Sequence, residues 1–364
     1  MTNKAIGIKD VAAAAGVSVT TVSHVLNDVA YARVGTETRE RVQEVARRLG
    51  YGPNRLAQAL RTQRSGMIGF ISEEIATTPH AGRIILGAEE TARAHGYNIM
   101  IINAASTGSV DTREQDVAAL LDRQVDGVLY ATMYHRKLSV PKNLTALPAV
   151  LVDSEDISQA VCSVIPDEEG GARAAVQTLI DAGHTRIGMI NNTDDVPATH
   201  SRLTAFKKTL ADAGLPFHPE LVQSEHSEVI GGYEAAMRLL TPGSRPTAVF
   251  CYNDRMAMGA YRAAGELGLH IPADLSIVGF DNQQLIAENL YPGLTTVALP
   301  HYEMGAWATR NLIAAIEGKT DLTLFAAHPT VLPCPMVLRH SVASPKHKGA
   351  SSRAAPDSPT RANA

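Results

Sequence analysis

Hydrophobic positions recur at helical spacing in the N-terminal part of the chain. Over residues 8–27 they fall three to seven residues apart, which predicts two short helices separated at Gly16. Gly16 suits a tight left-handed turn, and Ser18 is a natural N-cap for the second helix. Residues 36–50 predict a third helix with basic residues in its last turn and a final glycine. The first two helices share a minimal predicted core: Val11, Ala15, Val17, Val22 and Leu26.

A different pattern begins near residue 66, where short Val- and Ile-rich runs alternate with amphipathic stretches. Strands are predicted over residues 66–72, 98–103, 127–132, 149–153, 186–191, 248–251 and 276–280. Helices are predicted over residues 80–95, 112–124, 168–182, 200–213, 229–240 and 254–267. Buried apolar strands that alternate with helices are typical of parallel sheets with right-handed crossovers. A last helix over 301–317 and a last strand over 330–338 are expected to return the chain across both sheets.

The two patterns predict an all-α helix-turn-helix head, a single short helix over residues 51–61, and an α/β core of two doubly wound lobes. At 364 residues the chain is too long for one typical core. Ligands of such lobes belong in the crevice outside the carboxyl ends of the strands. The expected divisions are a head at 1–52, a hinge helix and linker at 53–65, a core at 66–343 (lobe 1 about 66–165 and 296–325, lobe 2 about 166–295 and 326–343), and a disordered tail at 344–364.

The charge is distributed unevenly between the head and the rest of the chain. Residues 1–64 hold ten Lys and Arg against five Asp and Glu, whereas the remainder holds 23 against 32. A basic head on an acidic body suits a head that meets nucleic-acid phosphates and a body that does not. The exposed side chains of the second helix favour a major-groove reader. The alternative is an ordinary helical hairpin with a solvated Ser- and Thr-rich face.

The sequence gives little support to catalysis, cofactors or metal. Cys162, Cys251 and Cys334 lie far apart, so a disulfide or a zinc site is not expected. The signatures of hydrolases, dinucleotide enzymes, P-loop proteins and zinc proteases are missing from the sequence. The pair Asp194-Asp195 reads as solvated carboxylates, and no cofactor is expected. The N-terminus has no apolar signal core and no segment is apolar enough to span a bilayer, which predicts a cytoplasmic, nucleoid-associated protein.

Many short motifs in this order resemble the lactose-repressor/galactose-repressor family of bacterial transcription regulators, over about residues 8–341. The motifs in the head and hinge are Lys9-Asp10-Val11-Ala12, Gly16-Val17-Ser18, Thr21-Val22-Ser23, Val25-Leu26-Asn27, Tyr51, Pro53-Asn54 and the helix that contains Leu60. Those in the core are Asn253-Asp254-Arg255-Met256-Ala257, Gly279-Phe280-Asp281 and Leu294-Thr295-Thr296-Val297. The resemblance implies a homodimeric repressor whose core is similar to periplasmic sugar-binding proteins.

The resemblance also implies which head residues contact DNA. Val19 and Thr20 match the variable pair that reads base edges in the major groove. His24 stands where the family usually has Arg, which leaves the half-site preference at that base open. The phosphate contacts are matched by Ser18, Thr21, Ser23 and Asn27.

Residues 54–60 match the family's hinge helix, which binds the minor groove. Leu60 matches an apolar wedge that kinks the site, and Ala57 is the small residue that lets the helix approach the groove floor. Asn54 and Arg55 precede them as further DNA contacts. The alternative for Leu60 is a plain core leucine. A helix this short is expected to fold only with its dimer mate and DNA, which makes it a plausible switch.

The core residues implied to bind an effector are His80, Asp153, Arg202, Asn253 and Asp281. Asp281 follows an apolar strand and can accept two hydrogen bonds from vicinal hydroxyls, whereas Arg202 supplies a fork of donors. The alternative for these polar residues is an N-cap or a satisfied surface group, and for His80 a structural role at a helix start.

The implied function is repression at a roughly palindromic operator, relieved by a small sugar-like effector. A co-repressor-dependent regulator, responsive to a purine or a sugar phosphate, is the alternative within the same fold. An enzyme, a secreted sugar-binding protein and a DNA-binding protein with an unliganded core are less consistent with the sequence. A dimer is favoured over a tetramer because the tail lacks a leucine-heptad helix.

Overall fold

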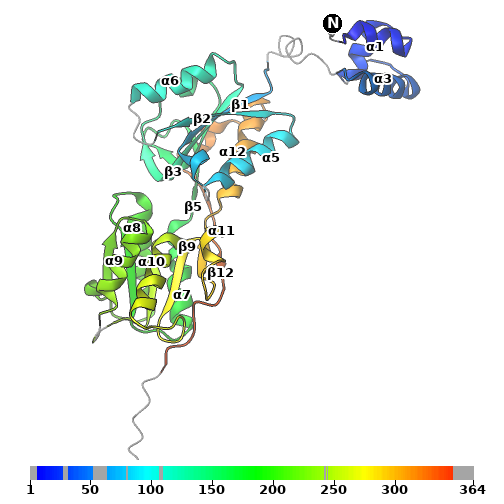
Figure 1. The fold of residues 1–364 in the computed structure, drawn as a ribbon. Coiled ribbons are helices and arrows are strands. Elements are labelled where there is room, and N and C mark those ends of the chain that lie inside the picture. The colour runs from blue at the N-terminus through cyan, green and yellow to red at the C-terminus, as the bar shows by residue number, and fades with distance from the viewer. Residues whose placement is uncertain are drawn as a thin grey trace, which may run out of the picture.

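The computed structural model describes residues 6–27, 32–51, 64–78, 81–105, 110–241, 243 and 245–346. They form a three-helix head and an α/β core with two six-stranded sheets, which confirms the predicted fold class (Figure 1). Three predictions lie outside the described residues: the hinge helix with Asn54, Arg55, Ala57 and Leu60, the ligand contact of His80, and the tail after residue 346.

The head consists of α1 (Ile8–Ala15), α2 (Val19–Leu26) and α3 (Thr36–Leu49). As predicted, α1 ends at Gly16 with φ of 65°, and Ser18 caps α2 by accepting a hydrogen bond from the Thr21 amide at 3.1 Å. Arg41 Nε donates to the Ala15 carbonyl oxygen at 3.1 Å and so ties α3 to the end of α1. The buried core of the head is Val11, Ala12, Ala15, Val22, Val25, Val42, Val45 and Ala46.

Lobe 1 carries the sheet of order β11-β5-β4-β3-β1-β2, and all its strand pairs are parallel. Its strands are β1 (Met67–Glu73), β2 (Asn98–Ala104), β3 (Gly127–Leu138), β4 (Ala149–Asp156), β5 (Cys162–Pro166) and β11 (Thr330–Leu332). Its helices are η1 (Ile75–Thr77), α5 (Gly82–Ala94), α6 (Val110–Leu121), η2 (Lys142–Ala146), α12 (His301–Ile316) and η4 (Leu322–Phe325). β3 is bulged where its pairing with β4 shifts after Ala131.

Lobe 2 carries the sheet of order β12-β10-β9-β8-β6-β7, which is parallel except for β12. Its strands are β6 (Ile187–Asn192), β7 (Val222–Glu225), β8 (Ala248–Cys251), β9 (Ser276–Asp281), β10 (Thr295–Ala298) and β12 (Met336–Val337). Its helices are α7 (Glu168–Asp181), α8 (Pro197–Asp212), η3 (Pro219–Leu221), α9 (Val229–Leu239), α10 (Asp254–Glu266) and α11 (Gln284–Ala287).

The single strand predicted over residues 330–338 is wrong, because the chain forms two short strands there in different sheets. β11 pairs with β5 in lobe 1, and β12 pairs with β10 in lobe 2. Pro333 and Pro335 separate them, since proline lacks the N–H that a continuous ladder needs. The chain therefore crosses between the lobes after β5, after β10 and at these prolines. The last two crossings lie a few residues later than the boundaries expected at 296 and 326.

The C-terminal segment lies along lobe 2 up to Lys346. The Ala343 amide donates to Ser276 Oγ at 3.1 Å, and the Ala343 carbonyl oxygen is 2.9 Å from Nε2 of the buried His184. Lys346 Nζ lies 2.8 Å from Asp274 Oδ1. Residues 344–346 were expected in the disordered tail, but Lys346 contacts lobe 2.

Two glycines allow helices α5 and α12 of lobe 1 to touch through their backbones. A Cβ built on Gly87 would collide with the Tyr302 carbonyl oxygen, and one built on Gly305 would collide with the Ile84 carbonyl oxygen. The two helices lie side by side over the sheet (Figure 1). Each glycine therefore permits the other helix to approach closely, and the pair acts as one unit.

The contact predicts a strong effect of Gly87→Ala on stability. The added methyl meets backbone that cannot rotate away, so the helices must separate, and we expect the free energy of unfolding to fall by about 1–3 kcal/mol. Gly82→Ala on the same helix is the control, because nothing lies within 4 Å of its Cβ position. Urea denaturation of both variants measures the difference, and equal midpoints would contradict the close packing.

Candidate functional site

The structure brings three of the predicted effector residues together where the lobes meet. Asp153 lies on β4 of lobe 1, whereas Arg202 on α8 and Asp281 at the end of β9 belong to lobe 2. Arg202 Nη1 is 3.9 Å from Asp281 Oδ1. The charges of Arg202 and Asp281 both act on the Asp153 carboxyl. The residues converge at the carboxyl ends of the strands, as a doubly wound fold predicts.

Arg202 is buried and surrounded by partners. Its side chain is 3% exposed, Nε donates to Glu168 Oε2 at 2.7 Å, and Nη1 donates to the Tyr252 carbonyl oxygen. The guanidinium carbon lies 3.6 Å from the centroid of the Phe280 ring and 4.4 Å from that of Tyr252. Burial lowers the pKa of Arg202, but the charges of Glu168, Tyr252 and Asp281 and the hydrogen bond to Glu168 together outweigh it, so the net pKa shift is upward and the charge is permanent.

Asp153 is a buried carboxyl that lacks part of its hydrogen bonding. It is 4% exposed with φ of 58°, and Oδ1 has no hydrogen-bond partner among the described residues. Burial raises the pKa of Asp153 well above its ordinary value, and the neighbouring Glu168 carboxylate raises it further. A buried, incompletely bonded carboxyl at a lobe junction is available to a ligand that offers a hydrogen-bond partner.

This environment predicts that Asp153→Asn stabilises the protein. Above the unfolded-state pKa near 3.9, the wild-type carboxyl must take up a proton on folding, which costs about 1.4 kcal/mol per pH unit until the folded-state pKa is reached. The raised pKa of Asp153 therefore destabilises the wild type increasingly as pH rises above about 4. We expect the variant to gain at least about 1 kcal/mol at pH 7 and little at pH 4.

Asp156→Asn on the same strand is the matched control, with the opposite sign. Burial raises the pKa of Asp156, but bonds from Ser158 and Ala160 outweigh it and the net pKa shift is downward. Its Oδ2 accepts hydrogen bonds from Ser158 Oγ at 2.6 Å and from the Ala160 amide at 2.9 Å. This replacement should destabilise the protein at pH 7. Urea midpoints of both variants at pH 7 and pH 4 measure these effects. An Asp153→Asn variant that is less stable than wild type at pH 7 would contradict a raised pKa of Asp153 in the folded protein.

Asn253 and its neighbour Asp254 are built into the fold of lobe 2. Asn253 caps α10, since its Oδ1 accepts from the Met256 amide at 2.8 Å and its Nδ2 donates to the Ser227 carbonyl oxygen at 3.0 Å. Asp254 is fully buried and accepts hydrogen bonds at 2.6 Å from Thr296 Oγ1 and from the Gln283 amide. Both side chains position the strand ends, and the expectation that Asn253 contacts an effector stays a prediction.

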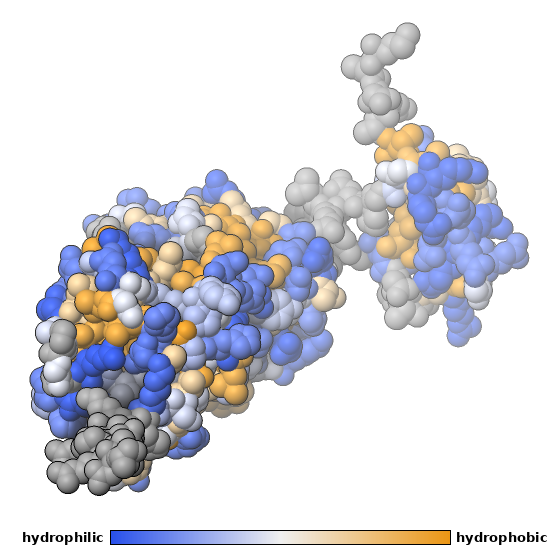
Figure 2. Space-filling view, turned by 60° about the horizontal axis from the view of Figure 1, so that its bottom comes forward, coloured by the Kyte–Doolittle hydropathy of each residue, from blue (hydrophilic) through white to orange (hydrophobic). Residues whose placement is uncertain are grey.

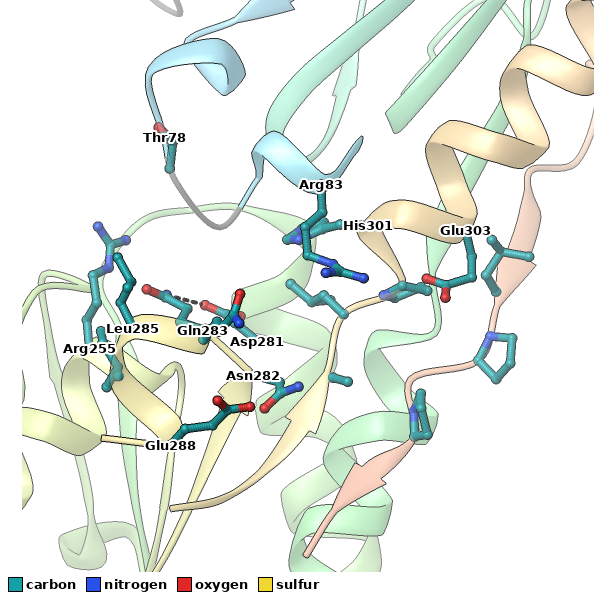
Figure 3. A pocket seen from close by; sticks show the side chains of 18 residues that line it. Thr78, Arg83, Arg255, Asp281, Asn282, Gln283, Leu285, Glu288, His301 and Glu303 are labelled. Atoms are coloured by element: carbon teal, nitrogen blue, oxygen red, sulfur yellow. Dashed lines mark hydrogen bonds between the residues drawn. The ribbon is translucent and has the colours of Figure 1, made fainter. Parts of the chain in front are cut away.

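A cavity of about 1050 Å³ lies beside Asp281 and is lined by residues of both lobes (Figure 3). Lobe 1 contributes Thr78 and Arg83, and lobe 2 contributes Arg255 and the segment that runs from Asp281 to Glu288. Two of the crossings between the lobes, with the ends of the elements beside them, supply Ala298, Leu299, Pro300, His301, Glu303, Leu332, Pro333 and Pro335. Of the predicted effector residues, Asp281 lines this cavity directly, with Gln283 Nε2 donating to its Oδ2 at 2.9 Å. Apolar walls with a few convergent polar groups are typical of small-molecule sites.

Sequence reasoning missed Glu168, Arg83, His301 and Glu303. Acidic Glu168 begins a helix, where a carboxylate is ordinarily explained by the helix dipole. Its pairing with Arg202 depends on contact between α7 and α8, which no local signal reveals. Arg83, His301 and Glu303 lie in the first turns of two helices that are distant in sequence.

The candidate DNA-contacting side chains of α2 lie on the outer surface of the head. Ser18, Val19 and Thr20 are exposed, and Thr21, Ser23, His24 and Asn27 are half-buried. Ser18 Oγ and Thr21 Oγ1 are 3.0 Å apart, and Asn27 Nδ2 donates to the Ser23 carbonyl oxygen at 2.8 Å. Val22 and Val25 alone in α2 are buried, so the helix presents its polar side outward.

Known protein families match both the head and the core of the chain. A family model described as "Bacterial regulatory proteins, lacI family" matches residues 7–54, and one described as "Periplasmic binding protein-like domain" matches residues 176–342. The chain is 33% identical to the ribose operon repressor of Haemophilus influenzae over 340 residues, which are 93% of this chain and 99% of that protein. The chain belongs to the LacI family. It is accordingly a ligand-responsive, DNA-binding transcriptional repressor.

Other members of the LacI family match along almost their full length. The PurR repressor of Vibrio vulnificus is 32% identical over 89% of this chain and 96% of that protein. The solved lac repressor dimer bound to operator and the anti-inducer ONPF has a TM-score of 0.74 at 28% identity, and covers 93% of this chain and 100% of that chain. A CelR–cellobiose complex has a TM-score of 0.64 at 28% identity, over 92% and 99% of the two chains.

Three further observations concern the thiols, the possible metal ligands and the helices of the LacI-family chain. Cys162, Cys251 and Cys334 are buried free thiols. Within the described residues, no group of three or more His, Cys, Asp or Glu side chains could hold a metal, and no helix is long and apolar enough to cross a membrane.

Proposed function

We propose that this repressor binds a roughly palindromic operator as a homodimer and releases it when a small sugar-like molecule closes the cleft between its lobes. The observation that carries the proposal is the convergence of Asp153, Arg202 and Asp281 from both lobes beside a large cavity. A ligand that bonds to both walls stabilises the closed arrangement by its differential affinity for the two states.

The chemistry of the site favours hydroxyl groups as ligands. The Asp281 carboxylate lines the cavity and can accept bonds from two vicinal hydroxyls, while Arg202 Nη1 lies 3.9 Å from its Oδ1. Asp153 can donate or accept in its protonated form. His80 and Asn253 remain proposed contributors to the same cleft.

At the other end of the protein, we propose that α2 enters the major groove. Val19 and Thr20 are exposed, as base contacts must be, with His24 as the third reader. Ser18, Thr21, Ser23 and Asn27 are the proposed phosphate contacts. Asn54, Arg55, Ala57 and Leu60 are proposed to bind the minor groove as a hinge helix, with Leu60 as the wedge.

Leu60→Ala tests the proposed hinge. The loss of the wedge removes the contacts that repay unstacking of a base step, so we expect operator affinity to fall at least about tenfold. Sugar binding should stay unchanged, because the cavity is formed by other residues. Leu324→Ala in lobe 1, at a side chain that is 77% exposed, is the control. Fluorescence anisotropy with labelled operator measures both, and wild-type affinity in Leu60→Ala would rule out the wedge.

The linker is attached to lobe 1 at points that connect it with the cavity. Arg64 Nη2 donates to the Ile316 carbonyl oxygen at 2.9 Å, at the end of α12, and the same helix begins at His301 in the cavity wall. The Ser65 and Gly66 amides each donate to the Asp126 carboxylate at 2.8 Å. A displacement of α12 on ligand binding would therefore reach the segment that leads to the hinge.

The proposal is tested by a thermal-shift screen with neutral monosaccharides and disaccharides, followed by operator binding with each sugar that stabilises the protein. A cleft ligand raises the apparent stability by mass action. We expect at least one sugar to raise the melting temperature and to weaken operator binding. The absence of stabilisation by any sugar would contradict the proposed effector class.

A co-repressor mechanism is the second candidate, because PurR repressors are among the relatives of similar identity. The two candidates predict opposite signs in the same assay. A purine base or a sugar phosphate that tightens operator binding would support the second, and a sugar that weakens it supports the first.

A further inference from the structure

Arg83 is a cationic side chain in the cavity wall that has no assigned role. It lies in the first turn of α5 and points from lobe 1 into the cavity, opposite Asp281 and Asn282 of lobe 2 (Figure 3). Its guanidinium carbon stands 5.9 Å from the centroid of the Tyr302 ring. Among the described residues, no acidic group lies within ion-pair distance of it. Arg83 is therefore able to donate hydrogen bonds into the cavity.

The helix that carries Arg83, α5, is packed tightly against α12. Gly87, one turn further along α5, meets the Tyr302 backbone, and Gly305 on α12 meets the Ile84 backbone. Tyr302 Oη also donates to Glu90 Oε2 on α5 at 2.7 Å. The helices α5 and α12 thus hold Arg83 and His301 at one end of the cavity, which limits the entropy lost when a ligand is bound.

Three other charged groups of the cavity wall have partners of their own: Asp281, Glu288 and Arg255. Asp281 lies 3.9 Å from Arg202 Nη1, and Glu288 lies 3.5 Å from Arg339 Nη2. Arg255 Nη1 is 2.8 Å from Glu228 Oε1. A ligand can therefore bind Arg83 without displacing a carboxylate, whereas at Arg255 it would compete with Glu228.

We propose that Arg83 is the residue by which lobe 1 recognises a neutral, hydroxyl-rich effector, while Asp281 recognises it from lobe 2. The inference rests on the proposed function and specifies the ligand class of that site. A guanidinium on one wall donates to ring or hydroxyl oxygens, and a carboxylate on the other accepts from hydroxyls. A molecule that satisfies both must carry acceptors at one end and donors at the other, as a sugar does.

The cavity offers no net positive charge to a strongly anionic effector. Two guanidiniums, Arg83 and Arg255, line it against the carboxylates of Asp281, Glu288 and Glu303. Behind the same wall Glu168 is paired with Arg202, and Glu288 is paired with Arg339, so these charges largely cancel. A phosphate or nucleotide would meet no net positive potential there, whereas a neutral sugar adds no charge.

Arg83→Gln tests the proposal, with Arg93→Gln as the matched control. Arg93 lies in the last turn of the same helix, where its Nη2 is 3.4 Å from Glu89 and its side chain is 69% exposed. The probes are ribose, cellobiose and a panel of further neutral mono- and disaccharides, with ribose 5-phosphate as the charged counterpart. Isothermal titration measures the dissociation constants, and size-exclusion chromatography measures the oligomeric state of each variant.

We expect the best-bound neutral sugar to bind Arg83→Gln at least about tenfold more weakly than wild type, and Arg93→Gln with wild-type affinity. Ribose 5-phosphate should bind the wild type more weakly than ribose does. Equal sugar affinity of Arg83→Gln and wild type overturns the inference and leaves the proposed function standing, whether or not the oligomeric state changes. Tighter binding of ribose 5-phosphate overturns the neutral ligand class. If no sugar binds wild type, the proposed sugar effector fails together with the inference.

Discussion

Replacing Arg202 by glutamine is expected to lower the free energy of unfolding by about 3–5 kcal/mol at neutral pH, the usual penalty for breaking a buried ion pair. The variant leaves Glu168 without its 2.7 Å partner and removes the guanidinium that packs on Phe280. Asp153 and Asp281 lose the same nearby cation. The carboxylates of Glu168 and Asp281 then lose the cation that lies near both of them.

The loss should depend on pH in a defined direction. Without Arg202 the folded-state pKa of the neighbouring carboxyls rises, so the penalty is present above their unfolded-state pKa near 4 and shrinks below it. Urea denaturation at pH 7.5 and pH 4 measures this difference. Lys208→Gln on the same helix is the control, because its exposed pair with Glu169 at 3.7 Å contributes little. An Arg202→Gln variant as stable as Lys208→Gln at pH 7.5 would contradict the role of Arg202.

Replacing Asp281 by alanine is expected to remove the effector response while operator binding persists. A carboxylate that accepts two hydroxyl hydrogen bonds contributes about 3 kcal/mol, so the affinity for the sugar should fall about a hundredfold or more. The head and the linker contacts at Arg64 and Asp126 lie in other parts of the chain, so the apparent operator affinity should be retained.

Asp281→Asn separates the carboxylate charge from the side-chain shape. We expect it to lose most of the response as well, because an amide offers one acceptor oxygen where the carboxylate offers two. Anisotropy with labelled operator and increasing sugar measures both variants. A normal response in Asp281→Ala would place the effector elsewhere.

The wall of the interlobe cavity mixes charged and polar side chains with apolar ones. Hydrophobic side chains also gather at the surface of the core in several places (Figure 2). Leu285 and Tyr291 are 74% and 97% exposed near the end of β9 and α11. Exposed apolar groups of this size suit the homodimer proposed above.

The sequence predicted long elements well because each has a full period of hydrophobic positions. α10 (Asp254–Glu266) lies where the pattern placed it, and so does the shorter β8 (Ala248–Cys251), whose four residues are all apolar. The strands β7 and β10 are as short but contain polar residues, so they lack the continuous apolar run that revealed β8. The split between β11 and β12 depends on which sheet each half joins, and this is a tertiary property.

Part of the candidate site could be predicted because some of its residues lie at the ends of recognisable strands. Asp281 and Asp153 follow recognisable strands, so their place at the cleft follows from the topology of the fold. Glu168 reaches Arg202 only through packing of α7 on α8, and Arg83 reaches the cavity only because Gly87 and Gly305 bring two helices together. Local patterns carry no signal for contacts of this kind.

We propose above all that a ligand in the interlobe cavity controls binding at the operator. It is tested most directly by titrating the full-length protein onto a labelled operator, selected by the protein from random DNA, with and without a sugar that raises its melting temperature. We predict that a saturating sugar moves the midpoint to at least about tenfold higher protein concentration, an effect of about 1.4 kcal/mol. A sugar that binds the protein and leaves the operator midpoint unchanged would contradict the claim.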